Sequence, residues 1–109
     1  MAQNLDSTAI SAKLIGSWTW KKQSIPNTNK FKDADKNIKV TFNMDSTFSV
    51  TENSNVVMQG IWKLFNYGIY YGLRTNQYSQ YLAGGVYFCD SQLLFVNSYV
   101  DGLDNLFEK

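Results

Sequence analysis

The stretch that decides the fold is IKVTFNMDSTFSVT, residues 38–51. Apolar residues alternate with polar ones on both sides of a polar break at residues 43–46. They are Ile38, Val40, Phe42, Phe48 and Val50. A period of two places the apolar side chains of a strand on one face, and Asn, Asp and Ser favour turns. The stretch therefore predicts a β-hairpin with one buried face.

The same alternation recurs along most of the chain. Further strands are predicted from Ser17, with Trp18 and Trp20 on one face, and at residues 58–64, 69–73, 78–83, 86–90, 93–99 and 103–109. A short helix precedes them, because Asp6 or Ser7 can cap it, Ile10 and Leu14 are four residues apart, and Gly16 ends it. The paired Gly84 and Gly85 predict a bulge or a sharp bend.

Residues 24–36 show no periodicity and are predicted to form the longest loop, which covers something or moves. The length of 109 residues suits one domain spanning residues 1–109. About eight short strands after one helix predict an all-β fold, a small up-and-down antiparallel β-barrel or a sandwich.

Composition excludes several functions. The chain has no histidine, so neither Ser–His nor Cys–His chemistry is available, and we expect no enzyme activity and no cofactor. The net charge is +1, and Asp33 and Asp35 interrupt the N-terminal lysines, which argues against nucleic-acid binding. No apolar run approaches the roughly 20 residues that span a bilayer.

Two further motifs do not predict a functional site. Asp33, Asp35 and Asn37 imitate the start of a calcium loop, but the glycine and the bidentate glutamate that complete such a loop are missing, so no metal site is expected. The single cysteine, Cys89, cannot form an internal disulfide and follows two aromatic residues. We expect it to be a small buried residue.

Strand parity places a set of aromatic rings inside a barrel. This set comprises Trp18, Trp20, Phe42, Phe48, Trp62, Tyr71 and Phe95. An eight-stranded barrel is just wide enough to be filled by side chains or to hold one small ligand. If it holds a ligand, the binding residues are Phe42, Phe48, Met58, Trp62, Tyr71 and Phe95.

A second interpretation uses the outer surface. Residues 64–89 carry one formal charge, Arg74, and Tyr70, Tyr81 and Tyr87 are expected to point outward. Such a charge-poor, Tyr-rich face suits a protein interface, including a homodimer, or the stacking of sugar rings.

The order of motifs resembles a known family. The motifs are a short helix entering Gly16-Ser17-Trp18, the strand GIWKL at residues 60–64, Cys89 with Leu93, Asn97-Ser98-Tyr99 with Asp101-Gly102, and Phe107 with Lys109. Together they are similar to the small lipocalin-like domains of Bacteroidetes, of the calycin type.

This resemblance implies a compact up-and-down barrel, often exported or lipid-anchored, so that a leader or membrane anchor would lie upstream of these residues. It also implies that Trp18 closes one end of the barrel, with Lys109 packed over its ring. The expected function is non-enzymatic binding of a small apolar molecule in the barrel interior.

Overall fold

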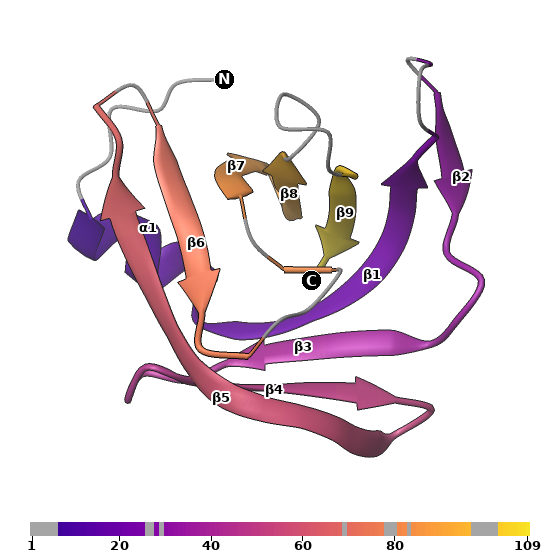
Figure 1. The fold of residues 1–109 in the computed structure, drawn as a ribbon, viewed down its shortest axis with the longest axis horizontal. Coiled ribbons are helices and arrows are strands. Elements are labelled where there is room, and N and C mark those ends of the chain that lie inside the picture. Colours follow the sequence, from indigo (N-terminus) through magenta and orange to yellow (C-terminus); the bar gives the residue numbers. More distant parts are fainter. Residues whose placement is uncertain are drawn as a thin grey trace.

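The structure is a computed structural model that describes residues 7–25, 28, 30–68, 70–77, 81–82, 84–96 and 103–109. One helix precedes a single sheet (Figure 1). The elements are α1 (Ser7–Leu14), β1 (Gly16–Ser24), β2 (Phe31–Asp33), β3 (Ile38–Phe42), β4 (Thr47–Glu52), β5 (Asn55–Asn66), β6 (Tyr71–Thr75), β7 (Gly84–Cys89), β8 (Gln92–Val96) and β9 (Asn105–Glu108). The helix α1 is not long and apolar enough to cross a membrane, and the described residues contain no other helix that is.

Antiparallel pairing closes the sheet on itself. Neighbours in space follow the order β1-β3-β4-β5-β6-β7-β8-β9, and β9 pairs with β1. Figure 1 shows β1 as a long curved strand that starts beside α1 and ends beside β2. Closure leaves few free edges, which removes the tendency of open sheets to aggregate. The predicted all-β fold, a closed eight-stranded antiparallel barrel with a short N-terminal helix, is confirmed.

The prediction of one long loop over residues 24–36 is wrong. Residues Phe31–Asp33 form β2, which pairs with the last residues of β1. The backbone N–H of Ala34 donates to the carbonyl of Lys21 at 2.8 Å, so the chain follows the edge of β1 before β3 begins. Periodicity could not show this strand, because all three of its residues are exposed.

The prediction for the paired glycines is correct only in part. Gly84 has a φ of 100°, which is a left-handed conformation that favours glycine, but it begins β7 and does not interrupt a strand. Of the strand predicted at residues 78–83, only Tyr81 and Leu82 lie within the described residues. They form a bend with buried side chains.

A bulge in β1 decides which residues point inward. Trp20 pairs with Phe107 and Lys22 pairs with Leu106, so Lys21 is an extra residue in the ladder. As a result, Trp20 and Gln23 are both buried, while the two lysines between them are exposed.

Candidate functional site

Three of the predicted ligand-binding residues are fully buried in the barrel interior. Phe42, Phe48 and Phe95 are each 1% exposed or less. The ring of Phe42 meets the rings of Trp62 and Phe95 at centroid distances of 5.8 Å and 6.5 Å, both with edge-to-face geometry. Edge-to-face pairs at this spacing stabilise a core. A ligand would reach these rings only by displacing side chains that already contact one another.

The other three predicted residues, Met58, Trp62 and Tyr71, line the β5–β6 side of the interior. Trp62 is 6% exposed, and its indole N–H donates to the carbonyl of Asn43 at 3.3 Å. Met58 and Tyr71 pack against the core but are only half-buried, as is Leu64. The accessible part of the predicted set therefore lies on one wall of the barrel.

One end of the barrel is built around Trp18. Its indole N–H donates to the carbonyl of Leu14 at 2.8 Å, which joins the strand to the end of α1. The ammonium of Lys109 lies 5.0 Å from the centroid of the Trp18 ring and donates to the carbonyl of Ile15 at 3.3 Å. A Cβ at Gly16 would come within 3.1 Å of that ammonium, so glycine leaves room for the cation.

A buried polar network lies toward the other end of β1. The side-chain oxygen of Asn105, a residue that is fully buried, accepts hydrogen bonds from the indole N–H of Trp20 and the amide of Gln23, both at 3.1 Å. Tyr81 packs its ring on Trp20 at 4.7 Å and is 9% exposed. The prediction that Tyr81 points outward is wrong, because the bend at residues 81–82 directs it against Trp20.

The outer face of β5 carries most of the exposed large apolar side chains. Within the described part of the chain these side chains include Val56, Val57, Ile61 and Phe65 on β5 and Tyr67 immediately after it, with exposures of 36–58%. Val57 is an extra residue between the pairs Val50–Met58 and Thr51–Val56, so both valines are exposed. Scattered exposed apolar residues are ordinary, but here four lie on one strand and a fifth immediately follows it, which makes this face the main candidate for an interaction surface.

Two cations lie at one end of this face. Lys63 of β5 and Arg74 of β6 are direct cross-strand partners. Their charged groups lie 5.9 Å and 5.0 Å from the centroid of the Phe65 ring, and Arg74 also lies 6.0 Å from Tyr67. Neither cation forms an ion pair or a side-chain hydrogen bond with a described residue. Like charges that face each other directly across two strands are destabilising.

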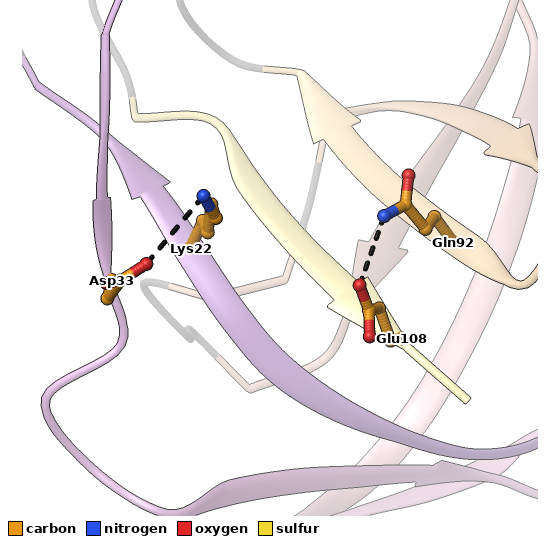
Figure 2. A network of polar contacts seen from close by, with 4 residues as sticks. All are labelled: Lys22, Asp33, Gln92 and Glu108. Carbon is orange, nitrogen blue, oxygen red and sulfur yellow. Dashed lines mark hydrogen bonds and ion pairs between the residues drawn. The ribbon is translucent and has the colours of Figure 1, made fainter.

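Charged and polar groups are paired differently on the β1–β2 and β8–β9 ladders. There Lys22 faces Asp33, with nitrogen and oxygen 3.7 Å apart, and Gln92 donates to Glu108 at 3.1 Å (Figure 2). Each of these pairs joins cross-strand neighbours of complementary chemistry. The pair formed by Lys63 and Arg74 is the opposite case.

Glycines hold the tyrosine rings beside these cations. Gly72 and Gly85 face each other across β6 and β7. A Cβ at Gly72 would lie 2.5 Å from the Tyr67 ring, and one at Gly85 would lie 3.4 Å from the Tyr70 ring. The two rings stack at 5.2 Å. Aromatic side chains that cover glycines in this way are a known means of stabilising a sheet, and here they extend the apolar surface from Phe65.

The remaining candidate groups are dispersed. Cys89 is exposed, so the prediction of a buried cysteine is wrong: Val86 and Phe88 take the inward positions of β7 and the next residue falls outside. Asp33 and Asp35 are exposed, and the described residues contain no group of three metal-ligating side chains. Hydrogen bonds from the hydroxyl and backbone N–H of Thr47 lower the pKa of Asp45, a turn residue.

Comparison with known protein families, curated proteins and solved structures finds no match for this chain. The class of protein therefore rests on the fold. It is a closed eight-stranded antiparallel β-barrel, consistent with a calycin-like architecture. Its outer wall carries exposed apolar side chains on β5 and two neighbouring cations that have no acidic partner among the described residues.

Proposed function

We propose that this chain is a non-enzymatic, lipocalin-like binding module that docks a partner protein on the outer face of β5. The observation that carries this proposal is the run of exposed apolar side chains from Val56 to Tyr67. Burying such a surface is the main driving force of protein association, and aromatic residues are enriched at interfaces.

The backbone of β5 supports the same proposal. Its pairing with β6 covers residues 62–66, and Asn76 extends that contact to Ile61. Figure 1 shows that β6 lies beside only the half of β5 nearer to α1. Among the described residues, positions 55–60 of β5 pair only with β4. A strand edge that no described strand covers, with apolar side chains, can accept a further strand from another chain.

Sedimentation velocity over a range of concentrations tests the proposal, with a second copy as the first partner. We expect concentration-dependent association that Ile61→Lys abolishes. Met44→Lys is the matched control, because Met44 is 83% exposed but lies in the turn between β3 and β4. A wild-type chain that stays monomeric and co-purifies with no other protein would contradict the proposal.

A second candidate function is the binding of a small apolar molecule inside the barrel. It is favoured by Met58, Leu64 and Tyr71, which pack toward the core yet remain half-buried beside Trp62. A thermal-shift screen with fatty acids, sterols and bile acids tests it, since a ligand at about 100 times its Kd adds roughly 2.7 kcal/mol. No stabilisation by any of these compounds would reject the candidate.

A further inference from the structure

We infer that Lys63 and Arg74 together receive a carboxylate of the partner, so that the segment docking on β5 is an acidic, apolar polypeptide. The inference rests on the proposed interaction surface, because Phe65 belongs both to that surface and to the ring contacts of the two cations. It adds the chemistry of the partner, which the apolar residues alone do not define.

Lys63 and Arg74 place two like charges side by side. Two cations occupy directly opposite positions on β5 and β6, and neither has an acidic partner among the described residues. No Asp or Glu occurs anywhere in residues 53–89. Two like charges therefore face each other across β5 and β6 with no acidic side chain of a described residue beside them, and an anion between them would be attracted to both.

The aromatic rings beside Arg74 restrict the orientation of its side chain. Its guanidinium lies near the rings of Phe65 and Tyr67, and Tyr67 is held in turn against Gly72 and Tyr70. A guanidinium near aromatic rings keeps its N–H groups available in a planar fork that matches a carboxylate. Because the rings already restrict this side chain, less conformational entropy is lost when the anion binds.

The exposed surface of β5 beside the cations indicates which other residues the partner needs. Ile61, Lys63 and Phe65 occupy alternate positions of β5 and are all exposed. Residues 62–66 of β5 already pair with β6, so a docking segment would lie across the outer face here, and alternate side chains of an extended segment would contact this row. Apolar residues would contact Ile61, and an acidic residue would reach Lys63 and Arg74, so an extended segment of alternating apolar and acidic residues complements this row.

The chain contains a single arginine, so the Nε–H signal of Arg74 can be identified without ambiguity in an NMR spectrum of the ¹⁵N-labelled protein. The probe is a short blocked peptide of alternating leucine and glutamate. Its control is the same peptide with glutamine in place of glutamate. We expect the glutamate peptide to shift the Arg74 signal saturably and the glutamine peptide to bind roughly ten- to a hundredfold more weakly. Added salt should weaken the binding of the glutamate peptide.

Two variants complete the test. Lys63→Glu should abolish binding of the glutamate peptide and at the same time raise the melting temperature, because it pairs opposite charges across β5 and β6. Lys39→Glu makes the same change on the exposed side of β3 and should leave binding intact. A merely structural role for Lys63 predicts a lower melting temperature instead.

Equal binding of the two peptides would refute the preference for an acidic partner but would not contradict docking on β5. The inference is also rejected if the glutamate peptide produces no saturable shift, or if Lys63→Glu leaves its binding unchanged. A lower melting temperature of Lys63→Glu would contradict a repulsion between Lys63 and Arg74. If the wild-type chain associates and Ile61→Lys abolishes that association, any of these results rejects the acidic partner alone. The proposed docking on β5 then still holds.

Discussion

Replacing Asn105 by alanine should destabilise the barrel more than any exposed polar substitution. The side chain is fully buried, and its oxygen accepts hydrogen bonds from Trp20 and Gln23. The substitution leaves two buried donors without that acceptor, at about 1–3 kcal/mol each. We therefore expect the free energy of unfolding to fall by about 2–6 kcal/mol, a large part of the roughly 5–15 kcal/mol available to a small domain.

Urea denaturation followed by far-UV circular dichroism measures this loss. Asn55→Ala is the matched control, because Asn55 is exposed and its side chain makes one long hydrogen bond with a described residue, to the carbonyl of Asn53 at 3.5 Å. We expect it to change stability by less than about 0.5 kcal/mol. Combining Asn105→Ala with Trp20→Phe should cost clearly less than the sum of the single changes, since both remove the same hydrogen bond. Additive effects, or a loss below about 1 kcal/mol for Asn105→Ala, would refute the network.

Three further predictions concern the barrel end, the ring support and the response to acid. Lys109→Met should cost about 0.5–2 kcal/mol in urea denaturation by removing the cation from the Trp18 ring, and Lys109→Arg should retain much of it. Gly72→Ala should cost about 0.5–1.5 kcal/mol by displacing the exposed Tyr67 ring from its stacking on Tyr70, and it should cost clearly less when Tyr67 is already Ser; an equal cost in both chains would disprove the contact. The lowered pKa of Asp45 means that its carboxylate stabilises the fold above its ordinary pKa of 3.8 and ceases to do so as the pH falls through the lowered value. Asp45→Asn should therefore destabilise the protein near neutral pH and lose that difference in acid, as urea denaturation at several pH values would show.

The barrel interior shows which features strand parity predicts and which it does not. Alternation correctly assigned Phe42, Phe48 and Phe95 to the inside of the sheet, and all three are buried. Whether inward residues leave space depends on how rings from different strands meet. The contact of Phe42 with Trp62 and Phe95 is set by the curvature and closure of the sheet, which no local pattern encodes.

The outer surface shows the same division. The lack of charge in residues 64–89 pointed to an interaction surface, but the sequence pattern wrongly placed Tyr81 on it, because the bend at residues 81–82 does not follow strand parity. The meeting of Lys63 with Arg74 depends on the register between β5 and β6. A shift of one residue would reverse which side chains share a face, and the sequence of either strand alone does not fix that register.

The sequence of residues 38–51 by itself determined a two-residue period. The same period elsewhere determined an all-β chain with one buried face, because alternation is a local property of each strand. The lack of histidine in the chain also excluded Ser–His and Cys–His chemistry. Only the tertiary structure decided that β1 closes on β9, that β2 forms within a predicted loop, and that two cations face each other over Phe65. These features arise from hydrogen bonds and charges between residues distant in the chain, so their energies appear only when the strands are brought together.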